Sequence, residues 1–310
     1  MSASEQPVAD AVESAIERIR SVYRSWNRET SATQMRRDWD AAFAACTIPV
    51  SRQEIIAGGV PAEWIVPSGA PTDRVIVYFH GGGFRIGSIA SHLDLIARIA
   101  AASGFRTLAI DYRLAPEHRF PAALEDAVAA LEWLGGQGYD AAHIALAGDS
   151  AGGNLVLASM LELRRRGREL PVAAALMSPW TDLAATGASY ETRAKGDPIH
   201  QRSMILALAK NYLGEDGDPR DPLVSPLYAD LAGLPPLLIQ AGDLETVRDD
   251  STMLAERASA AGVEVELQVW DGMIHVFQMF PEIPQAGEAV AAVAAFLRRH
   301  LGTRPKGQDR

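Results

Sequence analysis

The 310-residue chain contains only one cysteine, Cys46, so no disulfide can form within it. Its cysteine content therefore gives no reason to expect an oxidising compartment. Cys46 follows two alanines in a stretch with helical character, and we predict that it is buried as a small hydrophobic residue. The first residues have neither the basic start nor the apolar run of a secretory signal, so we expect a cytoplasmic location.

Long apolar runs and positive charge are also scarce. No uncharged apolar run approaches the ~20 residues that cross a bilayer, so we expect no stable membrane insertion. The chain has 29 Lys and Arg against 39 Asp and Glu, and the net charge of -10 disfavours nucleic acids and anionic membranes as partners. The one basic cluster, at residues 164–168, closes a predicted helix, where cations complement the helix dipole.

Motifs for metals and phosphates are missing as well. The sequence has no histidine or cysteine cluster with metal-ligand spacing, no H-E-x-x-H motif, and neither of the glycine-rich phosphate-binding motifs. We therefore predict no metal site and no cofactor. With 48% hydrophobic and 22% charged residues, the chain can bury one large core and fits a single domain with an added lid.

Strand-like and helix-like segments alternate through most of the chain. The strand-like runs are mostly continuous in their apolar character, as expected of parallel strands buried on both faces. They cover residues 75–79, 107–110, 144–147, 172–177, 237–241 and 263–269. The helical stretches include residues 93–102, 122–134, 155–165, 253–261 and 289–301. This order predicts an α/β fold with a mostly parallel, doubly wound central sheet.

Two stretches fall outside this alternation. Residues 8–45 look helical, and residues 181–221 contain a predicted helix near residues 201–213. The first helix should bury one face, formed by Val12, Ile16, Ile19 and Tyr23. We predict three parts: an N-terminal helical segment over residues 1–50, an α/β domain over residues 51–302 with an insertion at about 181–221, and a flexible tail over residues 303–310.

The pentapeptide Gly148-Asp149-Ser150-Ala151-Gly152 stands between a predicted strand and a predicted helix. This is the context of a nucleophile elbow, in which a serine is held out on a strained turn. Small residues two places on either side let the backbone bend that tightly. A serine hydroxyl is a poor nucleophile and needs a base within reach, so Ser150 is the predicted nucleophile.

Three consecutive glycines follow another predicted strand, about seventy residues upstream, in His80-Gly81-Gly82-Gly83-Phe84. Amides without side chains can approach a reacting carbonyl and donate hydrogen bonds to its developing oxyanion, each worth about 3 kcal/mol. After a strand, this loop is typical of an oxyanion hole. A flexible turn or a phosphate loop is the alternative, but the phosphate motifs are missing.

The base should be a histidine that follows the serine in the chain. Four of the seven histidines precede Ser150, which leaves His200, His275 and His300. His275 lies just past a predicted strand, where catalytic groups gather, whereas His200 lies in a polar segment and His300 ends a helix. His275 is therefore the predicted base, with a satisfied core histidine as the alternative.

The orienting acid should lie between serine and histidine, after the strand at residues 237–241. The chain there contains Asp243 and Glu245. Spacing alone cannot choose between these two carboxylates.

The motifs together resemble a known family. HGGGF at residues 80–84, DYRLAPEH at 111–118, FPA at 120–122 and GDSAGG at 148–153 look like those of the bacterial hormone-sensitive-lipase-like esterases. These esterases belong to the α/β-hydrolase superfamily, and the resemblance covers roughly residues 55–300. It implies the α/β-hydrolase fold with a helical cap.

The resemblance also implies roles for individual residues. In the family, the acid starts an Asp-Pro-Leu-Arg-Asp run, and aligning residues 248–249 with its end places Glu245 on the acid. The chain departs from the family here, because aspartate is usual and the proline is missing; glutamate can still orient an imidazole. Asp243 would then cap the following helix. The implied oxyanion donors are the N–H groups of Gly82, Gly83 and Ala151, and Ala151 fits independently, since it begins a helix.

His80 should brace the glycine loop rather than take part in the chemistry, and Asp149 and residues 111–113 should be polar scaffolding. The resemblance implies that the two additional helical stretches form the cap over Ser150. Candidate pocket residues are Phe84, Met35, Trp39, Phe43, Met204, Ile205 and Leu208.

These roles predict a serine carboxylesterase that forms an acyl-enzyme and acts on small-molecule esters with short to medium acyl chains. Lactone hydrolysis is the nearest alternative, because a lactone is an internal ester, and amide hydrolysis is less favoured. A small-molecule receptor without catalysis is an alternative from a different functional class, since plant hormone receptors resemble this family but lack the catalytic histidine. His275 argues against that reading. The sequence leaves a homodimer open.

Overall fold

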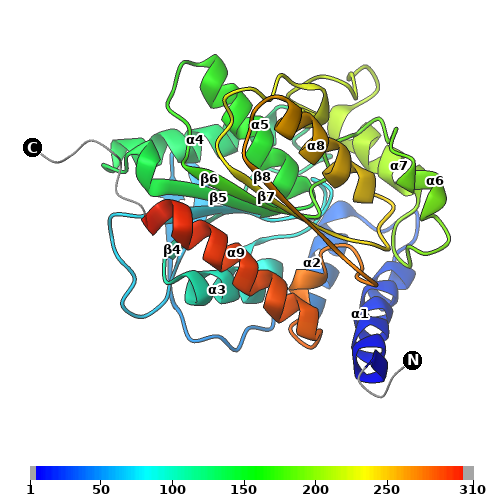
Figure 1. Cartoon of the computed structure of the whole chain (residues 1–310). Coiled ribbons are helices and arrows are strands. Elements are labelled where there is room, and N and C mark those ends of the chain that lie inside the picture. Colours follow the sequence, from blue (N-terminus) through cyan, green and yellow to red (C-terminus); the bar gives the residue numbers. More distant parts are fainter. Residues whose placement is uncertain (1–4, 303–310) are drawn as a thin grey trace, which may run out of the picture.

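An eight-stranded sheet forms the centre of the molecule, which is described by a computed structural model over residues 5–302 (Figure 1). The strand order is β1-β2-β4-β3-β5-β6-β7-β8. The strands are β1 (Ser51–Ala57), β2 (Val60–Val66), β3 (Val75–Phe79), β4 (Arg106–Ile110), β5 (Ile144–Asp149), β6 (Ala173–Met177), β7 (Leu237–Gly242) and β8 (Val265–Trp270). The tail predicted over residues 303–310 lies outside the described residues.

Six of the strands run parallel, from β4 through β8 across the sheet, whereas β2 pairs antiparallel with both β1 and β4. All six parallel strands were predicted, and the mostly parallel sheet is confirmed. The β1–β2 hairpin was not predicted. Most side chains of β1 are exposed at the edge of the sheet, so this strand lacks the apolar run by which the six parallel strands are recognised.

Helices cover both faces of the sheet, as the doubly wound fold requires (Figure 1). The apolar sides of α4 (Ala122–Gly136), α5 (Ala151–Arg165) and α8 (Arg248–Ala260) pack in one core. A second core, on the other face, contains α3 (Ile89–Ser103) and α9 (Pro284–Gly302). The predicted helices are confirmed, with α5 ending at Arg165 inside the basic cluster.

The helices outside the alternation gather at one end of the molecule (Figure 1). They are α1 (Glu5–Ser25), α2 (Ala32–Phe43), the short α6 (Ser189–Thr192) and α7 (Arg202–Leu213). The predicted face of α1 is buried at Val12, Ile16 and Ile19, in a third cluster with residues that follow β8. Arg20 on α1 donates a hydrogen bond to the carbonyl of Pro198, 3.1 Å away, which joins the N-terminal segment to the insertion.

One prediction about the N-terminal segment is wrong. Cys46 lies beyond the end of α2 and is only partly buried, packed at the margin of the second core. The two alanines before it extend the helical pattern in sequence, but the helix ends at Phe43 and both alanines are exposed.

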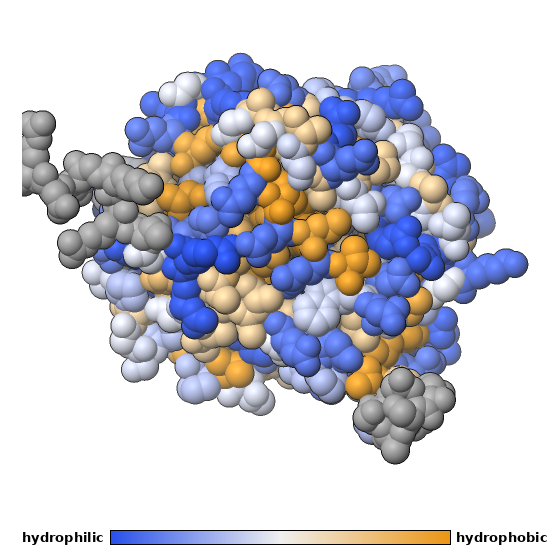
Figure 2. Space-filling view, in the orientation of Figure 1, coloured by the Kyte–Doolittle hydropathy of each residue, from blue (hydrophilic) through white to orange (hydrophobic). Residues whose placement is uncertain are grey.

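The edge strand β8 pairs with β7 alone among the described strands. Figure 2 shows hydrophobic surface in the middle of the face where Figure 1 places β8. Two large hydrophobic residues of this strand are exposed, Leu267 by 40% and Val269 by 43%. Within residues 5–302, no helix combines the length and the apolar character needed to cross a membrane.

Candidate active site

Ser150 occupies the sharp turn between β5 and α5. Its backbone has φ 51° and ψ −118°, a sparsely populated combination for a residue with a side chain. The neighbouring glycines leave no room for side chains: a Cβ on Gly148 would lie 2.6 Å from the backbone of Gly152, and one on Gly152 would lie 2.0 Å from the carbonyl oxygen of Phe79. The small residues of the motif therefore permit the strained turn that holds out the serine.

Ser150, His275 and Glu245 form one hydrogen-bonded chain, although 125 residues separate the serine from the histidine. His275 Nε2 lies 2.9 Å from Ser150 Oγ, and His275 Nδ1 lies 2.7 Å from Glu245 Oε2. The residues follow β5, β8 and β7 respectively, and the carboxyl ends of these parallel strands meet at the same edge of the sheet. The structure thus brings together the three residues that the sequence singled out.

Glu245 is completely buried and tightly held. Its Oε1 accepts hydrogen bonds from the hydroxyl of Ser178, at 2.7 Å, and from the N–H of Gly242. Ser178 Oγ in turn accepts a hydrogen bond from the N–H of Val276, next to the histidine, at 3.1 Å. Ser178 thereby fixes the carboxylate relative to the histidine loop. Ser178 was not among the residues predicted from the sequence, because nothing in a lone serine after β6 indicates where its hydroxyl points.

The surroundings of His275 act on its pKa in opposite directions. Burial lowers the pKa, whereas the charge of Glu245 and its hydrogen bond raise it, and the net result is a pKa above the usual 6.5. The carboxylate therefore favours the protonated imidazole that a proton transfer from Ser150 would create.

Asp243 makes different contacts. Its Oδ1 lies 2.8 Å from Arg193 and 3.2 Å from Arg248, in partly exposed ion pairs. The predicted helix cap is wrong: α8 begins after Val247, not after Asp243, and the N–H of Asp249 in its first turn donates to the hydroxyl of Ser189 at 3.0 Å. In residues 5–302, no hydrogen bond links Asp243 to His275. Asp243 comes directly after β7 and turns outward, whereas Glu245 turns back toward the sheet.

The glycine loop presents two unused amides. Gly82 and Gly83 have φ values of 112° and 62°, and neither N–H donates a hydrogen bond to another described residue. A Cβ on Gly82 would lie 2.1 Å from the carbonyl oxygen of Ile86, so the loop requires glycine there. Both glycines line the cavity beside Ser150. Ala151 is buried as the first residue of α5, where a helix leaves its N–H groups without intrahelical acceptors.

A buried network connects the elbow to the glycine loop. Asp149 accepts hydrogen bonds from the Tyr78 hydroxyl at 2.7 Å and from the Gly81 N–H at 3.0 Å. The Tyr112 hydroxyl donates to the carbonyl of His80 at 2.6 Å, and the two rings stack. Burial lowers the pKa of His80 to about 3, so its imidazole stays neutral. These contacts agree with the supporting roles expected for His80 and Asp149.

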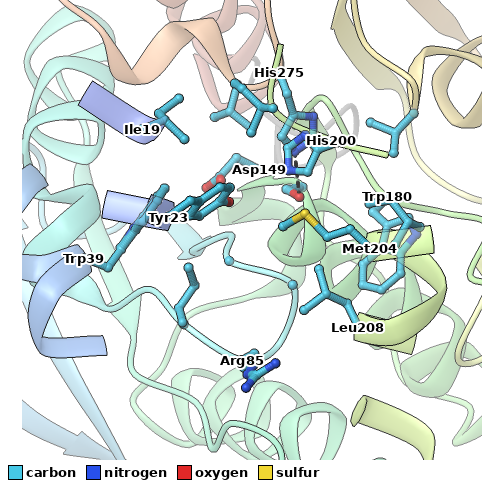
Figure 3. A pocket seen from close by; sticks show the side chains of 18 of the residues that line it. Ile19, Tyr23, Trp39, Arg85, Asp149, Trp180, His200, Met204, Leu208 and His275 are labelled. Carbon is cyan, nitrogen blue, oxygen red and sulfur yellow. Dashed lines mark hydrogen bonds between the residues drawn. The ribbon is translucent and has the colours of Figure 1, made fainter. Parts of the chain in front are cut away.

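A cavity of about 360 Å³ opens beside Ser150 and is lined mainly by apolar side chains. Figure 3 shows residues of the N-terminal helices on one side of it and residues of α7 on the other. The lining includes the predicted pocket residues Met35, Trp39, Met204, Ile205 and Leu208, together with Ile19 and Tyr23. Phe43 does not line the cavity; it packs against Trp39 and Phe280.

Phe84 is a further correction, because it does not line the cavity either. Its side chain is fully buried and stacks on Tyr212 of α7, with ring centroids 3.9 Å apart. Its backbone has a φ of 57°, and its ring lies in the core beneath the insertion. The predicted contact of Phe84 with substrate is therefore wrong, because its side chain packs in the core.

His200, set aside in the sequence analysis, lies in the cavity against the ring of His275. The described residues contain no group of three or more histidine, cysteine, aspartate or glutamate side chains arranged to hold a metal ion.

Known proteins resemble this chain in sequence and in structure. A family model for the alpha/beta hydrolase fold matches residues 76–279. The chain is 42% identical over 249 residues to an acetyl-hydrolase of Streptomyces hygroscopicus, covering 80% of this chain and 83% of that protein. It is 38% identical over 248 residues to an esterase of Acinetobacter venetianus, covering 80% and 82%. A crystal structure of an esterase from the bacterial hormone-sensitive lipase family superposes with a TM-score of 0.90 at 44% identity, covering 94% of this chain and 99% of that one.

Proposed function

The chain belongs to the bacterial hormone-sensitive-lipase family of α/β-hydrolase esterases, and from this we propose that it hydrolyses carboxylic esters through an acyl-enzyme on Ser150. The observation that carries the proposal is the hydrogen-bonded chain from Ser150 through His275 to the buried Glu245, beside an apolar cavity. A nucleophile, a base and an orienting acid in this order are the parts that acyl transfer needs.

In the acylation step, His275 Nε2 takes the proton of the Ser150 hydroxyl as its oxygen attacks the ester carbonyl. The carbonyl oxygen becomes an oxyanion, which the N–H groups of Gly82, Gly83 and Ala151 would stabilise. Glu245 stabilises the resulting imidazolium and keeps the proton of Nδ1 in place. His275 then gives its proton to the alcohol oxygen, and the carbon–oxygen bond to the alcohol breaks.

Deacylation repeats the sequence with water. His275 takes a proton from the water, whose oxygen attacks the acyl carbonyl, and returns a proton to Ser150 as the acid leaves. A lactone would react in the same way, with its alcohol remaining tethered to the acyl group, so lactone hydrolysis stays the nearest alternative. A receptor without catalysis would not need the hydrogen bond between His275 and Ser150. The homodimer and the cytoplasmic location stay predictions.

Activity across ester chain lengths tests the proposal. A cavity of about 360 Å³ limits the acyl group, so p-nitrophenyl esters with chains up to roughly eight carbons should be preferred over long-chain esters. The measurement is kcat/KM for the acetate, butyrate, octanoate and palmitate esters, with lactones of matched size alongside. Turnover of lactones but not of simple esters would favour the alternative, and an inactive protein would refute the proposal.

Removal of residues 1–45 should impair the enzyme. It deletes α1 and α2, which supply Ile19, Tyr23 and Trp39 to the cavity wall and cover apolar residues after β8. We expect a large loss of soluble yield or of kcat/KM on short esters, because the deletion exposes a contiguous apolar surface. Light scattering and ester kinetics measure the two effects. A soluble truncation with undiminished activity would show that the N-terminal segment is no part of the cap.

A further inference from the structure

His200 lies just before α7, and its side chain lines the cavity next to the candidate base (Figure 3). Its ring meets the ring of His275 edge to face, with centroids 4.6 Å apart and an angle of 80° between the planes. The mechanism described above does not use this second imidazole. Most of the cavity wall is apolar, and polar ring nitrogens cost free energy in apolar surroundings. Packing alone therefore does not explain a histidine at this place.

The two ring nitrogens of His200 have different surroundings. Nδ1 is buried without a hydrogen-bond partner, and the nearest carboxylate oxygen, Oδ2 of Asp197, is 4.0 Å away. Asp197 is itself fixed, because it accepts hydrogen bonds of 2.8 Å from the N–H groups of Ile199, His200 and Thr246. Its negative charge favours the tautomer with the proton on Nδ1. Nε2 is then left with a free lone pair.

Nε2 of His200 is available to a ligand. Within residues 5–302, no side chain or backbone group forms a hydrogen bond with it, and it is not one of the buried side-chain atoms left there without a hydrogen-bond partner, so it is not sealed off in the core. Burial and the neighbouring His275 lower the pKa of His200 to about 4, against the opposing charge of Asp197. At neutral pH the ring is therefore uncharged, and Nε2 can accept a hydrogen bond.

The proposed reaction indicates which part of the substrate lies near His200. His275 Nε2 must come within hydrogen-bond distance of the alcohol oxygen in order to protonate it. The carbons attached to that oxygen therefore lie beside the His275 ring, which His200 contacts. A group one or two bonds further along the alcohol could reach the second imidazole.

We propose that His200 is a specificity-determining residue that accepts a hydrogen bond from a hydroxyl group on the alcohol part of the ester. The hydrogen bond would then give the enzyme a higher kcat/KM for monoacyl esters of diols and polyols than it would have with an apolar side chain at position 200. The inference rests on the proposed ester hydrolysis and adds to it the class of the alcohol.

The test compares three esters of one acid: 2-hydroxyethyl, propyl and 2-methoxyethyl butyrate. The propyl ester has nearly the size of the hydroxyethyl ester and lacks the hydroxyl, and the methoxyethyl ester keeps the oxygen but cannot donate. For each protein, the quantity of interest is kcat/KM for the hydroxyethyl ester divided by kcat/KM for the propyl ester. Any effect of a substitution that changes kcat/KM equally for both esters drops out of this ratio.

In His200→Phe, which keeps a ring against His275, the ratio should fall about tenfold, the loss expected for one hydrogen bond between neutral groups. His200→Gln retains an acceptor and should recover part of the ratio. His118→Phe makes the same substitution at an exposed histidine outside the cavity and should behave like the wild type. The wild type should also favour the hydroxyethyl over the methoxyethyl ester by about tenfold, a comparison that needs no variant.

An unchanged ratio in a folded His200→Phe, or equal wild-type activity on the hydroxyethyl and methoxyethyl esters, would overturn the inference and leave ester hydrolysis standing. A ratio that collapses in Tyr23→Phe instead would assign the contact to the hydroxyl of Tyr23, which also lines the cavity. A wild type that hydrolyses none of the three esters would refute the proposed function itself.

Discussion

Ser150→Ala should lower kcat for short esters by about 10⁶-fold and leave the melting temperature close to that of the wild type. The serine hydroxyl carries the chemistry and contributes little to packing, and alanine leaves the glycine contacts around the elbow unchanged. Kinetics and thermal melting of the purified variant measure both effects. Ser68→Ala, at an exposed serine far along the chain from the elbow, is the matched control and should be fully active.

His275→Ala should cause a similar loss, and the double variant Ser150→Ala/His275→Ala should be little worse than either alone. Members of a triad act as a unit, so their effects do not add. If Ser150→Ala lost activity only together with thermal stability, the serine would be a structural residue and not the nucleophile.

Glu245→Gln should lower kcat by about 10⁴-fold with little change in KM, because the imidazole loses the partner that sets its tautomer and stabilises its cation. The pH profile gives a second readout. Glu245 raises the pKa of His275 against the effect of burial, so without this charge the pKa should fall. Since kcat/KM rises as His275 loses its proton, the acid limb of the remaining activity should move to lower pH in the variant.

Asp243→Asn is the matched control for the acid. Its ion pairs with Arg193 and Arg248 are partly exposed, so their loss should cost at most about 1 kcal/mol of stability and little rate. A near-normal rate for Glu245→Gln, together with a collapsed rate for Asp243→Asn, would reverse the assignment of the acid.

The features that depend on local sequence were predictable. Gly148 and Gly152 mark a turn that few other residues allow, and the glycine loop at residues 81–83 follows a buried strand that is apolar throughout. The order of serine, acid and histidine then left His275 as the best placed of three histidines. The acid could not be chosen from spacing, because Asp243 and Glu245 share one turn and only the path of the chain decides which carboxylate points inward.

Features that depend on tertiary contacts were missed or misread. The role of Ser178 depends on the separate chain segments that carry Glu245 and Val276. His200 reaches the cavity only because the insertion folds back over the sheet, and its polar neighbours in sequence concealed this. Phe84 follows the glycine loop, yet its ring is taken up by packing on Tyr212. In each case the sequence gives the residue type but not the direction of the side chain.

Covalent labelling of Ser150 tests the central claim most directly. Diethyl p-nitrophenyl phosphate reacts with an activated serine: the oxygen bonds to phosphorus, p-nitrophenolate leaves, and the phosphoryl group stays on the enzyme. The account predicts one nitrophenolate released per chain, loss of esterase activity in parallel, and mass spectrometry that places one diethylphosphoryl group on Ser150, with no label on Ser150→Ala. Full inactivation with the label on another residue, or esterase activity that persists in Ser150→Ala, would contradict it.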